Sequence, residues 1–167
     1  MKKSILLLLL FIPLGILAQG QKIAVVNVNA VFEAMPEIDA YETEMSKLTE
    51  RYESEYKMLQ DQYTRKLSDF TAQRDSLTEN IRTLRQQEIE DLATKTQNFV
   101  SMAQETISNK RQELIAPIQE RFQKAIKDVG AENGYAYIFP NDPQFILSAN
   151  SSAINITDKV KAKLGIK

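Results

Sequence analysis

A long tract without glycine constrains this chain more than any other feature. Residues 36–129 contain no glycine, and their two prolines are Pro36, at the first position, and Pro117. Near both ends of the tract, apolar residues are spaced three and four apart, as in the seam of a coiled coil: Ile38, Tyr41, Met45, Leu48 and Tyr52, and then Ile115, Ile118, Phe122, Ala125 and Val129. The tract therefore predicts long helices that carry an apolar stripe.

The middle of the tract predicts a reversal of the chain. Ser76 and Glu79 have the spacing of a capping box, so a new helix is expected to begin at Leu77. We therefore predict two helices that fold back on each other as an antiparallel hairpin, with the arm at 37–133 and its tip near 74–78. Because each helix is longer than the radius of a compact domain of this size, the hairpin is expected to protrude.

Composition argues against several kinds of function. The 167 residues carry a net charge of −1, so the dense positive charge that sequence-independent nucleic-acid binding needs is missing. There is no cysteine and no histidine, which removes disulfides, thiol chemistry, the most common general base and the usual zinc ligands. No arrangement of a nucleophile and a base stands out. We therefore expect no enzyme, no cofactor and no metal site.

Residues 1–18 have the layout of a secretory signal peptide. Lys2 and Lys3 precede a leucine-rich apolar run, and Ala18 supplies a small residue for cleavage. An uncleaved membrane anchor is the alternative, but the apolar stretch 4–18 is shorter than the roughly 20 residues that span a bilayer. We expect export with cleavage after Ala18, which removes two lysines and leaves a mature chain with a net charge of −3.

The segments outside the tract predict a small sheet. Residues 22–28 form a β-branched apolar run, Tyr135–Phe139 alternates as a strand, and Phe145–Leu147 is a further short apolar run. A last helix is expected at 158–164. The predicted fold class is therefore α+β, with a small β-sheet body built from both chain ends and a long helical hairpin as a coiled-coil arm.

The predicted body, at 19–36 and 134–167, is too small to enclose a large core by itself. Its strands carry apolar residues on both faces, so we expect it to self-associate. The candidate oligomerisation residues are the apolar residues of the predicted strands: Ile23, Val25, Val26, Val28, Tyr135, Tyr137, Phe139, Phe145 and Leu147.

The expected tip of the arm leans basic through five residues: Arg65, Lys66, Arg74, Arg82 and Arg85. A solvated helix end is the simpler explanation, and a binding role is the alternative. Farther along, Pro117 removes one backbone hydrogen bond from a helical pattern and predicts a kink just before it. This kink either acts as a hinge or only bends the helix onto the body.

Taken in order, these segments resemble the OmpH/Skp-like family of periplasmic chaperones. The resemblance covers nearly all of the chain after residue 18, and three segments carry it: Lys22–Val28, Pro117–Tyr135 and Ile154–Val160. It implies a homotrimer joined through the β body, with three arms around a cavity that holds unfolded outer-membrane β-barrel proteins without ATP. The implied location is the periplasm.

In such a chaperone, aromatic and methionine residues of the arm are candidates for contact with the client: Tyr56, Tyr63, Phe70, Phe99 and Met102. Packing between the two helices is the simpler explanation for those that lie in the seam. An exported coiled-coil scaffold that bridges envelope proteins is the alternative function. An assay of client aggregation separates the two.

The charge of the arm departs from this resemblance. The best-known members of the family are strongly basic, whereas residues 37–133 carry 19 acidic and 14 basic side chains. A membrane surface or lipopolysaccharide is therefore a weaker expectation as a partner, which the basic tip keeps open.

Overall fold

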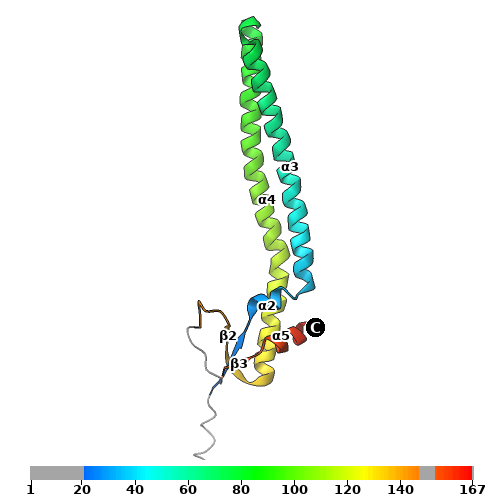
Figure 1. Cartoon of the computed structure of the whole chain (residues 1–167), viewed down its shortest axis with the longest axis vertical. Helices are drawn as coiled ribbons and strands as arrows, with labels where there is room; N and C mark the ends of the chain where they lie inside the picture. Colours follow the sequence, from blue (N-terminus) through cyan, green and yellow to red (C-terminus); the bar gives the residue numbers. More distant parts are fainter. Residues whose placement is uncertain (1–20, 147–152, 167) are drawn as a thin grey trace, which may run out of the picture. The chain divides into compact units, whose positions relative to one another are not determined.

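The computed structural model describes residues 21–146 and 153–166 of the chain (Figure 1). The predicted signal peptide and Leu147 lie outside these residues. Contacts divide the described chain into two compact units, which we call the body (residues 21–35 and 121–166) and the arm (Pro36–Glu120). The longest helix, α4 (Glu79–Asn133), contributes residues to both units.

The arm is an antiparallel pair of helices. Helix α3 spans Pro36–Gln73, the short 3₁₀ helix η1 spans Arg74–Ser76, and α4 follows from Glu79. Figure 1 shows α3 and α4 side by side, joined at η1. Tyr52 of α3 packs against Phe99 of α4 with ring centroids 5.8 Å apart. The predicted helical hairpin is confirmed.

Apolar side chains between α3 and α4 form a narrow core along the arm. The buried ones keep spacings typical of a helical seam: Met45 and Leu59 on α3, and Ile89, Leu92 and Ala103 on α4. Each of them retains 7–9% exposure, because a two-helix seam covers a side chain from one side only. The stability of the arm therefore depends on many small contacts along its length.

The turn between the helices differs from the predicted one. Ser76 belongs to η1, and its hydroxyl donates to the carbonyl oxygen of Gln73 at 2.7 Å. Leu77 is extended, and the Arg82 amide donates to the Thr78 carbonyl at 2.9 Å in the first turn of α4. The predicted capping box at Ser76 is wrong because the serine hydroxyl satisfies a carbonyl that the end of α3 leaves without a helical partner.

The body contains a three-stranded parallel sheet made from both chain ends. Strand β1 spans Lys22–Val26, β2 spans Tyr135–Pro140 and β3 spans Ile154–Asn155, in the order β2-β1-β3. Gly134, with φ of 67°, ends α4 in the left-handed conformation and lets the chain turn into β2. The prediction of a small sheet built from both chain ends is confirmed.

The first strand is shorter than predicted. Asn27 follows β1 and caps the short helix α2 (Val28–Phe32), because its side-chain oxygen accepts a hydrogen bond from the Ala30 amide at 3.0 Å. Val28 therefore lies in a helix and not in a strand. An N-terminal cap overrode the strand preference of the β-branched run.

The predicted strand at 145–147 is wrong for the two residues that the structure describes. The amides of Phe145 and Ile146 both donate to the carbonyl of Asp142 at 2.9 Å, which makes a turn. The Asp142 carboxylate also accepts from the Gln144 amide at 2.8 Å. Turn chemistry of Asp142 and the proline after it outweighs the short apolar run, and the third strand is β3 instead.

Helix α5 (Thr157–Leu164) completes the core of the body. The Thr157 hydroxyl oxygen accepts a hydrogen bond from the Asn27 amide at 2.9 Å, which joins the start of α5 to the end of β1. The largest fully buried side chains come from all parts of the body: Met35, Ile156, Val26, Val31 and Val160. This core fixes the position of the sheet relative to α5.

We expect Gly134→Ala to lower the free energy of unfolding by about 1–2 kcal/mol, because an alanine resists the left-handed conformation. Apart from Gly134 and its two chain neighbours, no atom of the described residues lies within 4 Å of the added Cβ, so strain and not a clash is the cause. Gly134→Asn, which tolerates this conformation better, is the matched variant and should cost less. Urea unfolding followed by circular dichroism measures both, and equal stability of alanine variant and wild type would contradict the expectation.

Candidate functional site

One face of the body sheet is apolar and open. In the register of the sheet, Ile23 lies beside Tyr137 and Val25 beside Phe139, and paired residues share a face. Val25 is buried, but Ile23, Tyr137 and Phe139 remain 45%, 53% and 44% exposed. The rings of Tyr137 and Phe139 stack with centroids 6.1 Å apart. We call Ile23, Tyr137 and Phe139 the open sheet face, and exposed apolar surface of this kind makes it a candidate interaction site.

The opposite face of the same sheet is covered. Ala24 and Val26 are 0% and 2% exposed. Ile138 packs against α4 at Gly130, where an added Cβ would come within 3.1 Å of the Ile138 Cδ1 atom. The small residue at this position lets helix and sheet approach closely. The sheet therefore uses one face for its own core and leaves much of the other face exposed.

The remaining oligomerisation candidates do not join the open sheet face. Val26 is buried in the core, and Val28 is half-buried in α2. The hydroxyl of Tyr135 accepts a hydrogen bond from Lys159 of α5 at 3.2 Å. Phe145 is 70% exposed in the turn after β2. The structure thus brings Ile23, Tyr137 and Phe139 together, with Val25 buried on the same face, and Leu147 lies outside the described residues.

The client-contact candidates on the arm divide among several environments. Tyr56 and Tyr63 line one groove of about 540 Å³ between α3 and α4. Phe99 packs in the seam, and Phe70 lines a small pocket at the tip. Met102 is 47% exposed. Tyr56 and Tyr63 are therefore the pair that shares one accessible surface.

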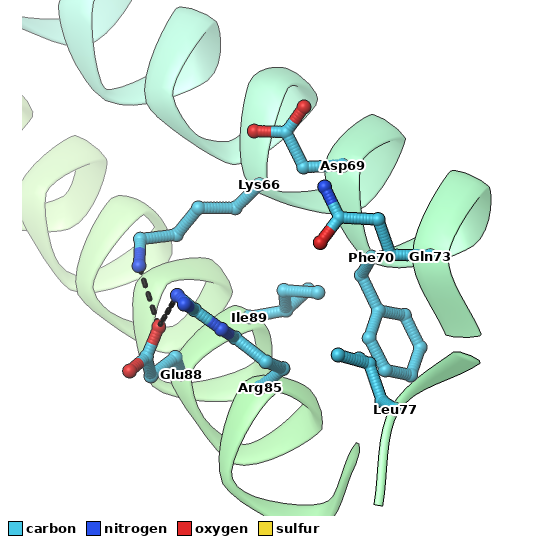
Figure 2. A pocket seen from close by; sticks show the side chains of 8 residues that line it. All are labelled: Lys66, Asp69, Phe70, Gln73, Leu77, Arg85, Glu88 and Ile89. Atoms are coloured by element: carbon cyan, nitrogen blue, oxygen red, sulfur yellow. Dashed lines mark hydrogen bonds and ion pairs between the residues drawn. The ribbon is translucent and has the colours of Figure 1, made fainter. Parts of the chain in front are cut away.

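At the tip, a single carboxylate joins the two helices (Figure 2). One oxygen of Glu88 accepts from Lys66 of α3 at 2.6 Å and from Arg85 of α4 at 3.3 Å. The hydrogen bond from Lys66 is the main reason that the pKa of Glu88 lies below its ordinary value; partial desolvation opposes this, and the charges of Lys66 and Arg85 add to it. Beside the bridge, Phe70, Leu77 and Ile89 help to line a pocket of about 120 Å³.

Most of the predicted basic tip is neutralised by nearby acids. Arg74 lies 3.2 Å from Asp75, and Arg82 lies 3.0 Å from Glu79. Arg65 is exposed and has no ion pair within the described part of the chain. Residues 65–88 carry five basic and four acidic side chains, a net charge of +1. The tip is therefore a network of ion pairs with little net charge.

The lowered pKa of Glu88 predicts how the tip responds to acid. The ionised carboxylate stabilises the folded arm above the ordinary pKa of glutamate, and this contribution is lost as the pH falls through the lower value of the folded state. In an NMR titration of the Glu88 carboxyl carbon, we expect Lys66→Met to move the pKa back toward its ordinary value. Arg65→Met, which removes a neighbouring unpaired charge, is the control. An unchanged pKa in Lys66→Met would rule out the bridge.

A second groove, nearer the start of α3, was not predicted from the sequence. It has a volume of about 530 Å³, and three of its six lining residues are basic: Lys47 and Arg51 from α3 and Lys110 from α4. Glu44, Leu48 and Thr106 complete the lining. The sequence offered no signal for this cluster, because its members come together only in the register of the antiparallel pair. We call Lys47, Arg51 and Lys110 the cationic groove.

The described residues offer neither a metal site nor a membrane-spanning helix. Among them, no group of three or more acidic, histidine or cysteine side chains could hold a metal ion. No helix within the described ranges is long and apolar enough to cross a membrane. Pro117 lies inside α4, which is helical on both sides of it, and the predicted kink stays a prediction.

The structural class is α+β, because the chain combines a hairpin of two long helices with a small parallel sheet from both chain ends. A family model described as outer membrane protein (OmpH-like) matches residues 22–164. The chain therefore belongs to the OmpH-like family, as the sequence resemblance predicted. No curated protein matches the chain.

The fold is also found in a solved structure. A protein from Caulobacter crescentus CB15, described as an OmpH-like outer membrane chaperone, is similar with a TM-score of 0.71 at 12% sequence identity. The match covers 87% of this chain and 84% of that chain. At this identity the similarity shows the shared fold.

Proposed function

We propose that this protein is an ATP-independent holdase chaperone of the periplasm. In this proposal, three copies associate through their bodies, and their arms enclose a cavity that holds unfolded outer-membrane proteins. Membership of the OmpH-like family supports a chaperone role and a location in the cell envelope. The description of the Caulobacter protein as an outer membrane chaperone supports the same role.

The open sheet face is the observation that carries the assembly part of the proposal. Ile23, Tyr137 and Phe139 expose apolar surface on a sheet whose other face is already packed. Association of bodies through this face would remove that surface from water, which is the main driving force of protein association. The body is also too small to cover both faces of the sheet with its own helices.

The arm is suited to hold a client weakly. Its apolar core is narrow, and apolar side chains such as Met58, Leu84 and Met102 are about half exposed. Many weak contacts of this kind would cover the apolar strands of an unfolded client, whose edges otherwise aggregate. Release would then require no energy source, in keeping with the absence of a catalytic arrangement in the sequence.

An aggregation assay tests the proposed function directly. A β-barrel outer-membrane protein, unfolded in urea, is diluted into buffer with the protein lacking residues 1–18, and light scattering is followed. We expect scattering to be suppressed at one trimer per client. Full aggregation at this ratio would contradict the chaperone function and favour the envelope scaffold. An assembly-deficient variant at the same chain concentration is the matched control.

The groove of Tyr56 and Tyr63 is the most direct candidate for client contact. We expect Tyr56→Ala combined with Tyr63→Ala to weaken protection in this assay, because aromatic side chains supply much of the contact area in protein recognition. Tyr52→Ala, which removes a seam residue packed on Phe99, controls for loss of arm stability. Protection equal to wild type in the double variant would remove these two residues from the client surface.

A further inference from the structure

The cationic groove is unusual in the arm that contains it. Residues 36–120 carry 17 acidic and 11 basic side chains, a net charge of −6. Three of those cations meet in one groove of about 530 Å³ that contains a single acid, Glu44. Lys47 and Arg51 are exposed and have no ion pair among the described residues. Their positive charge is therefore available to a partner.

Lys110 holds its charge on the other side of the groove. Its ammonium group donates to Glu113 at 2.8 Å, and this bond is the main reason that its pKa lies above the ordinary value; desolvation opposes the shift, and the charges of Glu113 and Glu44 add to it. Leu48, Thr106 and Lys110 are the half-buried residues of the lining. The unpaired positive charge of the groove thus comes from Lys47 and Arg51 of α3, while Lys110 of α4 is paired with Glu113.

An acidic stripe runs along the other flank of α3. Asp39, Glu42 and Glu53 each follow directly after a seam residue, whereas Lys47 and Arg51 each directly precede one. Successive residues of an α-helix are turned by about 100°, so the two sets lie on opposite flanks of the seam. All three acids are exposed and unpaired within the described ranges. We call Asp39, Glu42 and Glu53 the acidic stripe.

Cyclic assemblies use such a pair of surfaces. In a ring of three identical chains, each contact joins two different patches, one from each neighbour. Arms with a net charge of −6 repel one another when their charges are spread evenly. We propose that the cationic groove of one arm binds the acidic stripe of the arm of the next copy, so that neighbouring arms attach to each other near the start of α3. This inference rests on the proposed homotrimer and adds a second contact to it.

The contact is electrostatic and should respond to salt. Exposed charges are screened beyond about 3 Å at 1 M salt and beyond about 10 Å at 0.1 M. High salt should therefore release the arms from one another without dissolving an apolar contact between bodies, which salt does not weaken. The two contacts can be separated experimentally on this basis.

Distances between arms test the proposal. The chain has no cysteine, so Gln62→Cys places one spin label on the exposed surface of α3 in each copy. Double electron–electron resonance is measured at 0.05 M and 1 M sodium chloride, with the mass of the assembly determined in parallel. We expect narrow distances at low salt that lengthen and broaden at high salt. Lys47→Glu combined with Arg51→Glu should give the high-salt distances already at low salt.

Charge reversal on both sides makes the test specific. Glu42→Lys combined with Glu53→Lys should also release the arms, and the variant with all four reversals should restore the narrow distances. Lys57→Glu combined with Arg65→Glu makes the same change of charge on α3 outside the groove and should leave the distances as in wild type. Circular dichroism confirms that each variant is helical.

The outcomes separate this contact from the assembly itself. A trimer whose distances are the same in the wild type, the reversed variants and high salt would overturn the contact between arms and leave the chaperone proposal intact. Failure of the fourfold reversal to restore the narrow distances would overturn the pairing of these two surfaces. A monomer in all conditions would overturn both the homotrimer and the contact.

Discussion

Replacing both Tyr137 and Phe139 with serine is expected to convert the proposed homotrimer into monomers. The two side chains are 53% and 44% exposed on the open sheet face, and their rings stack on each other. Burial of a large apolar side chain contributes about 1.5–3 kcal/mol, so the loss of two in every copy removes most of the driving force for association. Sedimentation velocity at micromolar concentration measures the change in mass.

A matched variant separates the sheet face from apolar exposure in general. Met102 of the arm is 47% exposed, so Met102→Ser removes a similarly exposed apolar side chain from the other unit. We expect this variant to keep the mass of the wild type. The serine pair should also lose protection in the aggregation assay, because the proposed cavity between arms requires several copies. A serine pair that stays assembled would show that association uses another surface.

The second large effect concerns the core of the body. Ile156 is fully buried between β3 and α5, and we expect Ile156→Ala to lower the free energy of unfolding by about 2–5 kcal/mol. Ile154, two residues earlier, is 41% exposed. Ile154→Ala is therefore the control and should cost less than about 1 kcal/mol. Urea unfolding of the two variants distinguishes them, and equal losses would contradict the assigned core.

The hairpin is the part of the fold that the sequence predicts best. Seam residues such as Ile38 and Tyr41 repeat at three and four along a tract without glycine, and such a pattern has few other solutions. The predicted strand at Tyr135–Phe139 is also confirmed, because the alternation of its residues is a local signal. Local rules are sufficient where no competing interaction is present.

The predictions from the sequence fail where a side chain has two possible hydrogen-bond partners. Ser76 could cap the next helix or satisfy the carbonyl of Gln73, and it does the latter. Asn27 ends the first strand two residues early by capping α2. Asp142 accepts three hydrogen bonds in a turn where an apolar run suggested a strand. Short sequence patterns cannot weigh such local competition.

The candidate surfaces depend on register, which the sequence does not reveal. Ile23 and Tyr137 are 114 positions apart and meet because β1 pairs with β2 in parallel. The cationic groove likewise joins Lys47 and Lys110 across the antiparallel helices. At the tip, Lys66 and Arg85 both donate hydrogen bonds to Glu88 and are therefore ion-paired. Residue type alone suggested binding residues but not which of them act together.

The mass of the protein in solution tests the central claim most directly. The chain lacking residues 1–18 is passed through gel filtration, and light scattering gives its mass independently of its shape. The proposal predicts a trimer with a hydrodynamic radius larger than that of a compact protein of the same mass. A monomer or a dimer would contradict it, since neither provides three arms around a cavity.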